Sequence, residues 1–276
     1  ATVQKKYRLH TIEIMLEGNG KKIFIDGIPI NKLSDLIGIL NIVYFSPDEL
    51  KFIKETPAER RRFLDISLSQ QNKIYFHSLM RYNKILAQRN KLLKTDTHNP
   101  SLKDMLSIWD IQLAESGANI ILARRSYIEK LQCFAKEIHL DLTADKENLE
   151  LSYESLIEAG NREDILSEFT LKLSESMEKD INLMYTTVGP HRDDIKITLN
   201  GNNPRKFASQ GQQRTTALSI KIAELSLFEQ ETGETPVLLL DDVLSELDDY
   251  RKQKLYEQAN RTQTLITCTE FDFQPT

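Results

Sequence analysis

The chain has 276 residues, of which 40% are hydrophobic and 28% charged, a composition typical of a globular protein with one large or two modest domains. Its net charge of −5 excludes a uniformly basic nucleic-acid binder. The sequence has no apolar run of membrane-spanning length, no signal-peptide pattern and no metal-ligand spacing around Cys133 and Cys268, so we expect a cytoplasmic protein without membrane contact.

The first part of the chain has the pattern of β-strands. Side chains alternate over residues 9–16, and a second strand is predicted over 22–25. Between them, Asn19-Gly20 is a strong hairpin signal. A buried strand is predicted over residues 39–45.

At Pro57 the pattern changes to that of helices. Pro57 follows Thr56, a plausible helix cap, and suits the first turn of a helix. Apolar residues then recur three and four apart through residues 74–93, 102–138 and 165–184. The sequence therefore predicts a group of long helices after the first strands.

The last part of the chain alternates strands and helices. Strands are predicted at 195–199, 237–240 and 264–267, and helices at about 212–230 and 250–259. The continuous apolar run at 237–240 is typical of a strand buried on both faces. We therefore predict an α/β fold: a mixed-sheet head from residues 1–56 and 186–276, with an all-helical arm lobe, residues 57–185, inserted between the sheet segments.

Charge is divided unevenly along the predicted arm. Residues 51–94 hold eleven Lys or Arg and three Asp or Glu, whereas residues 135–185 hold five and thirteen. A basic lobe can bind the phosphates of DNA, although solvated helix faces and anchoring ion pairs also explain such a segment, and for residues 60–62 the two explanations are equally good. The DNA-backbone candidates are Arg60, Arg61, Arg62, Arg81, Lys84, Arg89, Lys91 and Lys94.

Two carboxylates follow the most apolar predicted strand. Asp241 and Asp242 come directly after residues 237–240, at the edge of an α/β sheet where ligand sites collect. One carboxylate there can bind Mg²⁺, which prefers oxygen ligands, and its neighbour can orient an attacking water. A strand followed by an acidic turn is nevertheless common, so this motif alone is a weak signal.

A second motif opens the predicted helix at 212–230. Residues 207–214 read Phe-Ala-Ser-Gln-Gly-Gln-Gln-Arg. The N-terminus of a helix offers free N–H groups to a phosphate, Ser209 adds a hydroxyl, and Gly211 permits close approach of the backbone. A polar helix cap is the commoner explanation of such a stretch taken alone.

The two motifs in this order resemble those of the ABC ATPase family. Residues 209–212 are similar to its signature, with Gln210 in place of a glycine, and Ser245-Glu246-Leu247-Asp248 is similar to its D-loop. The resemblance implies ATP and Mg²⁺ as cofactors, with Asp241 at the magnesium position and Asp242 at the catalytic one. It implies ATP contacts for Ser209, Gln210, Gly211, Gln212 and Asp248.

Further stretches resemble the RecF family of bacterial DNA replication and repair proteins, a branch related to SMC and Rad50 heads. These stretches are Phe45-Ser46-Pro47-Asp48-Glu49-Leu50, parts of 57–65, Gln88-Arg89-Asn90, Gly189-Pro190-His191-Arg192-Asp193-Asp194, 209–218 and 238–250. The resemblance implies an ABC-type head that forms a homodimer on binding ATP, binds double-stranded DNA, hydrolyses ATP weakly under DNA stimulation, and works with RecR to help RecA load at gaps and stalled forks. A role in the SOS response and a nucleoid-associated, cytoplasmic location are implied as well.

The sequence departs from this family at three places. It has no Gly-x-x-x-x-Gly-Lys-Thr phosphate loop, Pro47 falls near the usual Q-loop glutamine, and Cys268 or Thr269 stands at the switch-histidine position. We therefore expect a truncated or renumbered chain that does not hydrolyse ATP on its own. Two alternatives stay open: another ABC-type head of the Rad50, SMC or transporter kind, and a non-hydrolysing scaffold that binds DNA or a partner.

His191-Arg192-Asp193 is similar to the kinase catalytic loop, but no Asp-Phe-Gly accompanies it, which excludes a kinase. The loop is expected to order the following strand. For Arg192, a structural role and contact with a nucleotide or an adjacent lobe both stay open.

Overall fold

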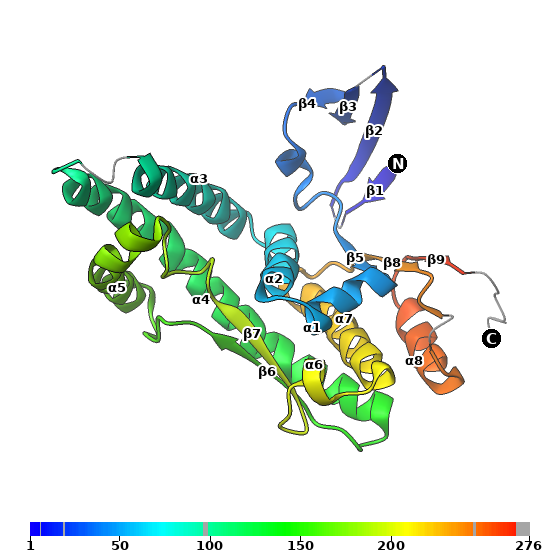
Figure 1. Cartoon of the computed structure of the whole chain (residues 1–276). Coiled ribbons are helices and arrows are strands. Elements are labelled where there is room, and N and C mark those ends of the chain that lie inside the picture. The colour runs from blue at the N-terminus through cyan, green and yellow to red at the C-terminus, as the bar shows by residue number, and fades with distance from the viewer. Residues whose placement is uncertain (6, 19, 96–98, 245–246, 269–276) are drawn as a thin grey trace.

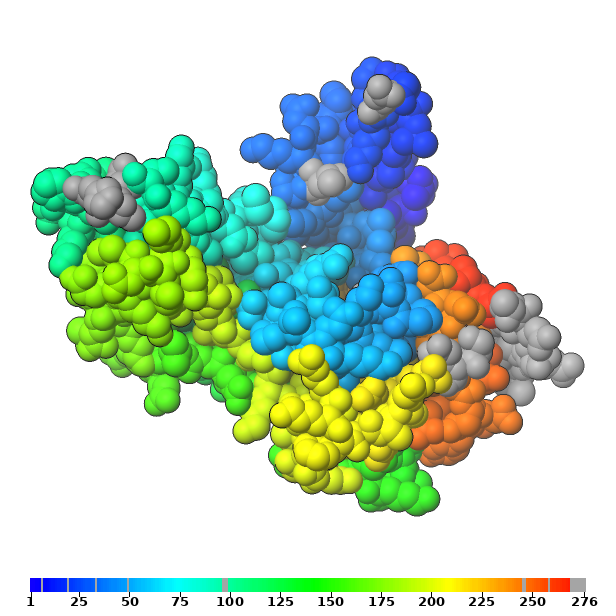
Figure 2. All heavy atoms as spheres, in the orientation of Figure 1, coloured from blue at the N-terminus to red at the C-terminus, as the bar shows by residue number. Residues whose placement is uncertain are grey.

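The computed structural model describes residues 1–5, 7–18, 20–95, 99–244 and 247–268 (Figure 1). An antiparallel sheet comes first, in the order β1 (Thr2–Gln4), β2 (Leu9–Glu17), β3 (Gly20–Ile25) and β4 (Ile28–Ile30). These strands confirm the first two predicted ones, while Asn19 of the predicted hairpin turn lies outside the described residues. In the space-filling view this sheet projects from the rest of the molecule (Figure 2).

A second sheet is parallel and has three described strands. Its order is β5 (Ile42–Phe45), β8 (Val237–Asp241) and β9 (Thr264–Thr267), with β8 in the centre. β5 begins three residues later than predicted, because the short helix η1 (Leu33–Leu36) runs into a turn in which Gly38 has a φ of +79°. The central position of β8 explains its apolar sequence.

The helical part follows β5. The short helices η2 (Pro47–Leu50) and α1 (Lys51–Lys54) lead into α2 (Pro57–Gln71) and α3 (Lys73–Thr95). The helix α4 (Leu102–Thr143) returns along α3 and is 42 residues long. It passes the predicted end at residue 138 and stops where Ala144 adopts a left-handed conformation, with a φ of +49°.

One strand interrupts the predicted helical arm. The chain forms β6 (Leu149–Glu154) before helix α5 (Arg162–Leu183), and β6 pairs antiparallel with β7 (Asp194–Leu199). The predicted α/β class with a mixed sheet is confirmed, but the inserted segment is not helical throughout. Sequence analysis missed β6 because it is short and separated by 39 residues from β7, the strand that satisfies its backbone groups.

Three helices belong to the last part of the described chain. A short helix α6 (Pro204–Phe207) precedes α7 (Gln210–Thr232), and α8 (Asp249–Ala259) lies between β8 and β9. α7 starts two residues earlier than predicted because Ser209 caps it, and it ends at Gly233, which has a φ of +67°. Residues 215–228 of α7 are largely buried, because this helix packs against both α4 and β5.

The base of the arm and the parallel sheet share one hydrophobic core. The core is continuous from Leu240 on β8 through Leu218 on α7 to Leu113 on α4. A second, smaller cluster of Leu92, Leu93, Leu102 and Leu106 closes the far end of α3 against α4. The division into head and arm therefore stays a prediction. Within the described ranges, no helix has both the length and the apolar character needed to cross a membrane.

Candidate nucleotide and nucleic-acid sites

The carboxyl end of β8 holds the predicted magnesium ligand. The Asp241 carboxylate is exposed and accepts hydrogen bonds from the Tyr44 hydroxyl at 2.9 Å and the Thr267 hydroxyl at 2.6 Å. These bonds, that of Thr267 first, lower the pKa of Asp241 below its ordinary value. Neighbours on β5 and β9 thus hold one ionised carboxylate at the sheet edge.

The next residue turns the chain sharply. Asp242 has a φ of +52°, a conformation that non-glycine residues seldom adopt outside tight turns. Its backbone N–H donates to the Thr267 carbonyl at 3.1 Å, which fixes the turn against β9. The Asp242 side chain is exposed. Its catalytic role stays a prediction.

The signature forms an exposed helix start. The Ser209 hydroxyl accepts from the Gln212 backbone N–H at 3.3 Å, and the Gln212 side-chain oxygen accepts from the Ser209 N–H at 2.8 Å. This capping box satisfies two backbone donors and holds the first turn of α7 in place. Gln210 and Gly211 are exposed, and a Cβ built on Gly211 would meet no atom closer than 4.0 Å. An anion can therefore approach this turn.

The segment after β8 leads from the carboxylates to α8. Asp248 accepts the Arg251 backbone N–H at 2.9 Å and forms an ion pair with the Arg251 side chain, so it caps α8. Ser245 and Glu246 of the predicted D-loop lie outside the described residues. At the predicted switch-histidine position, Cys268 is half-buried, and Thr269 also lies outside the described part of the chain.

The Mg²⁺ expected from the resemblance is compatible with this edge. Mg²⁺ is usually bound by one or two carboxylates together with waters and nucleotide phosphates, so Asp241 alone fits the protein's share of the ligands. Among the described residues, no group of three or more His, Cys, Asp or Glu side chains is placed to hold a metal. The site therefore suits a metal ion that is bound together with nucleotide phosphates, rather than one that protein side chains coordinate alone.

The three consecutive arginines of α2 have different environments. Arg60 makes two bonds to the Asp194 carboxylate, at 2.7 and 2.8 Å, and only 12% of its side chain is exposed. Arg61 is half-buried and donates to the Asp193 carbonyl at 2.8 Å. The Arg62 side chain is 72% exposed and lies 3.8 Å from Glu59. Arg60 therefore anchors α2 to β7, whereas Arg62 is the most exposed of the three, and its contact with DNA stays a prediction.

A cavity of about 560 Å³ opens beside these arginines. It lies among α2, α3, α4 and the loop before β7, and Arg61, Arg62, Arg124 and Asp65 line it. The one carboxylate of this group, Asp65, already pairs with Arg124 at 2.6 Å. Burial and the adjacent Arg124 lower the pKa of Arg61 from its ordinary value. The cavity therefore carries excess positive charge.

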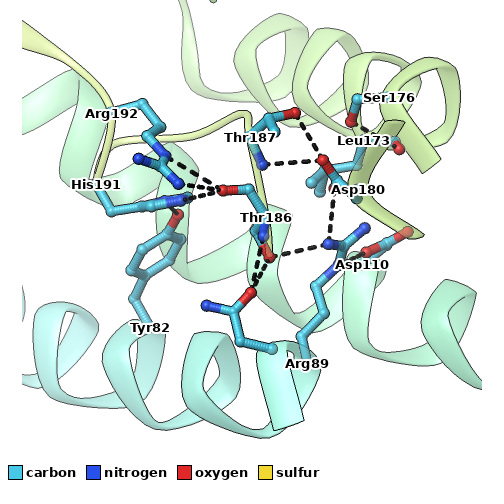
Figure 3. A network of polar contacts seen from close by, with 11 residues as sticks. Tyr82, Arg89, Asp110, Leu173, Ser176, Asp180, Thr186, Thr187, His191 and Arg192 are labelled. Atoms are coloured by element: carbon cyan, nitrogen blue, oxygen red, sulfur yellow. Dashed lines mark hydrogen bonds and ion pairs between the residues drawn. The ribbon is translucent and has the colours of Figure 1, made fainter. Parts of the chain in front are cut away.

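Arg89 is not a DNA contact. Its side chain is fully buried and binds Asp110 at 2.6 Å and Asp180 at 2.8 Å (Figure 3). It also donates to the Thr186 hydroxyl at 2.9 Å. The helical period of α3 turns Arg89 inward, where it ties α3 to α4 and α5. A basic residue in a basic segment looks the same in sequence whether it faces solvent or core.

The remaining basic candidates lie on the other face of α3. Lys84, Lys91 and Lys94 are exposed, spaced seven and three residues apart, and none forms an ion pair with a described residue. The Arg81 side chain is exposed and lies 3.3 Å from Glu115. The three lysines thus form a stripe of charge along the helix that no described carboxylate neutralises, and their contact with DNA stays a prediction.

The loop between α5 and β7 brings Thr186, His191 and Arg192 together (Figure 3). His191 Nε2 lies 3.0 Å from the Thr186 carbonyl and Nδ1 lies 2.6 Å from the Tyr82 hydroxyl. Because the carbonyl can only accept, Nε2 carries the proton of the neutral ring and Tyr82 donates to Nδ1. Arg192 donates to the same carbonyl at 3.0 and 3.2 Å. Its guanidinium also lies over the Tyr185 ring, 4.7 Å from the centroid. Arg192 thus has a structural role here.

Burial shifts the pKa values of two groups in this loop in opposite senses. It lowers the pKa of His191 to about 4 and raises that of Asp193 to about 6. The Asp193 carboxyl is buried and lies 2.5 Å from the hydroxyl of Tyr153 on β6. Between about pH 4 and pH 6, therefore, both groups favour their neutral forms.

Sequence analysis missed the residues that hold these sites in shape. Tyr44 and Thr267 support Asp241, while Asp110 and Asp180 neutralise Arg89. Each comes from a segment far away in the chain and belongs to no local motif. Only the buried position of Arg89 within the apolar period of α3 could have indicated that it needs carboxylate partners.

Comparisons with known proteins give the family. No family model matches the chain. The DNA replication and repair protein RecF of Agathobacter rectalis is 47% identical over 271 residues, which cover 98% of this chain and 73% of that protein. The RecF of Lachnoclostridium phytofermentans is also 47% identical, over 94% of this chain and 71% of the relative.

Solved structures agree with the sequence relatives. The recombination mediator protein RecF of the RecFOR pathway, in a structure described as RecF-ATPrS, superposes with a TM-score of 0.88 and 39% identity over 97% of this chain and 72% of that one. A structure described as RecF-ATP gives a TM-score of 0.87, also at 39% identity, over 96% and 72%. These relatives, together with the signature and the β8 carboxylates, show that the chain belongs to the RecF family.

Proposed function

We propose that this chain belongs to an ATP-dependent, dimerising DNA-binding protein of recombinational repair. The observation that carries the proposal is the exposed pair of candidate phosphate elements: the capped start of α7 and the ionised Asp241 at the end of β8. RecF relatives solved with ATP and with ATPrS support a nucleotide as the ligand.

In this proposal the signature residues bind the γ-phosphate of an ATP held mainly by a second subunit. Ser209 offers its hydroxyl, and the N–H groups of Gln210 and Gly211 lie in the first turn of α7, where backbone donors lack helical acceptors. Gln212 keeps this turn closed, and Asp248 lies at the subunit junction. ATP would therefore join two copies of the protein.

The carboxylates at the end of β8 supply the metal and water positions. Asp241 would hold Mg²⁺, and the metal would supply positive charge to the phosphates. Asp242 orients the attacking water. Weak, DNA-stimulated ATP hydrolysis is proposed for the full-length protein only, because the 276 residues contain no phosphate-loop sequence.

Double-stranded DNA is the proposed partner of the basic face of the arm. Lys84, Lys91 and Lys94 form the exposed stripe on α3, and Arg62 lies on α2 at the nearby cavity. Each side chain that neutralises a phosphate displaces a counterion. We further propose that the protein acts with RecR to help RecA load at gaps, in the cytoplasm and close to the nucleoid.

One experiment tests the nucleotide part of the proposal. DNA binding and dimerisation of the full-length protein are measured with and without ATP, beside Asp241→Asn and the control Glu175→Gln, which removes an exposed carboxylate from α5. We expect ATP to promote dimerisation in the parent and the control but not in Asp241→Asn. If ATP changes neither DNA binding nor dimerisation of the parent, the proposal is wrong.

A second experiment tests the DNA face. Replacement of Lys84, Lys91 and Lys94 together by Ala is expected to reduce the slope of log affinity against log salt by about 2 to 3. The control is Lys136→Ala, which removes an exposed lysine near the C-terminal end of α4 and should leave the slope unchanged. An unchanged slope in the triple variant would exclude these lysines.

A further inference from the structure

The side chain of Glu147 contacts Gln212, the last residue of the signature. It lies in the loop between α4 and β6, and its carboxylate accepts a hydrogen bond from the Gln212 side-chain nitrogen at 2.9 Å. The oxygen of the same amide accepts from the Ser209 N–H at 2.8 Å. Gln212 is therefore bound at both ends, by the helix cap on one side and by Glu147 on the other.

The chemistry of these partners decides which way the amide points. A glutamine side chain presents one acceptor and one donor group that are nearly equal in size, so its orientation is set by its neighbours. The Glu147 carboxylate can only accept, which directs the Gln212 nitrogen toward it. The oxygen is then directed to the Ser209 N–H, which can only donate. Without Glu147, only one of these two constraints is left.

Glu147 is itself held by a buried histidine. His139 Nε2 lies 3.3 Å from the Glu147 carboxylate, and His139 Nδ1 lies 2.8 Å from the Ser219 hydroxyl on α7. The His139 side chain is fully buried at the end of α4. The contacts at Gln212 and Ser219 are two turns apart on α7. The end of α4 and Glu147 thus hold the first turns of the signature helix from one side.

We infer that Glu147 is a positioning residue for nucleotide recognition. By fixing the Gln212 amide it keeps the Ser209 cap closed, which leaves the Ser209 hydroxyl proton and the first-turn N–H groups of α7 directed at the phosphate. This inference rests on the proposed role of the signature in binding ATP. Glu147 acts through Gln212 rather than on the nucleotide itself, because its two oxygens face Gln212 and His139.

The first test measures the ATP concentration that gives half-maximal dimerisation of the full-length protein. We expect Glu147→Ala to raise it about tenfold, since hydrogen bonds to a charged group are among the stronger ones. Glu147→Gln keeps an acceptor oxygen and is expected to stay within about threefold of the parent. Glu150→Ala, which removes an exposed carboxylate that contacts Asn148 and Thr198 but not α7, is the matched control.

Two further variants separate failure of the inference from failure of the proposed function. If Ser209→Ala and Asp241→Asn both dimerise with ATP as the parent does, the proposed nucleotide site is wrong and the positioning role is lost with it. If they lose dimerisation while Glu147→Ala matches the parent or exceeds it, only the role of Glu147 is overturned.

The second test needs no nucleotide and uses this chain directly. Hydrogen exchange at the Ser209 backbone N–H reports the bond to the Gln212 oxygen. We expect exchange there to be about tenfold faster in Glu147→Ala than in the parent, with Glu147→Gln in between and Glu150→Ala unchanged. Equal exchange at Ser209 in all four proteins would contradict the inference. The comparison with Glu147→Gln keeps the test decisive if Glu147→Ala folds poorly.

Discussion

Carboxylates occur in two different surroundings in this molecule: where Arg89, Asp110 and Asp180 join α3, α4 and α5, here called the arm junction, and at the end of β8. At the junction, Arg89, Asp110 and Asp180 are buried and bind one another. At the end of β8, Asp241 is exposed and is held from one side by two neutral hydroxyls. A buried charge must be matched inside the protein, whereas an exposed carboxylate held in a fixed position is available for a cation. Substitutions at the two places should therefore affect different properties.

The largest effect on stability is expected at the junction. Arg89→Met leaves two buried carboxylates without their cation, which should reduce the free energy of unfolding by about 3–5 kcal/mol. Lys91→Met on the exposed face of the same helix should change it by no more than about 0.5 kcal/mol. Urea unfolding of both variants measures the difference. Similar losses in the two variants would contradict the structural role given to Arg89.

A second prediction concerns pH. The pKa of His191 is about 4 in the folded protein and near 6.5 when unfolded, so its contribution to stability falls by about 3 kcal/mol as pH drops from 6.5 to 4. The pKa of Asp193 is raised from 3.8 to about 6, so its contribution falls by about 3 kcal/mol as pH rises across nearly the same interval. The two contributions oppose each other in the parent protein.

Single variants should separate these contributions. In Asp193→Asn, the free energy of unfolding should rise with pH between about 4 and 6.5 relative to the parent. In His191→Gln it should fall with pH between about 4 and 6. Urea unfolding at four pH values measures both slopes. Parallel pH profiles in the two variants would contradict the assigned shifts.

A smaller loss is expected from the loop backbone. Gly189 has a φ of +126°, and a Cβ there would lie 2.5 Å from the Tyr82 hydroxyl oxygen. Gly189→Ala should therefore reduce the free energy of unfolding by about 1–3 kcal/mol. Gly160→Ala, where a Cβ would meet no atom within 4 Å, is the control and should stay within about 0.5 kcal/mol of the parent. Equal denaturation midpoints for the two variants would contradict the predicted strain.

The smallest effect on folding is expected at the end of β8. The Asp241 side chain is exposed, so the urea midpoint of Asp241→Asn should match that of the parent. The same variant should lose the ATP response proposed above. A large shift of the midpoint would instead place Asp241 among the structural polar groups, and the contrast with the junction would fail.

Local motifs predicted the parts of the fold and site that depend on neighbouring residues. The signature, the apolar strand before Asp241 and the long helices are patterns within one segment, and each lies where expected. β6 was missed because its partner β7 comes after an intervening helix. Arg89 was wrongly assigned to the DNA-binding surface, because the charge of a residue does not show whether its side chain faces solvent or the core. Tyr44, Thr267 and Glu147 act on residues from distant segments, so no local spacing could reveal them.

The length of α4 has a mechanical consequence. At 1.5 Å per residue its 42 residues extend over about 60 Å, and the one helix carries Asp110 of the arm junction and His139 beside the signature helix. A continuous helix resists compression, so these two places cannot approach or separate without bending it. If α4 moves as one rigid body, a slight tilt of this helix at the signature end would displace its other end by several ångströms.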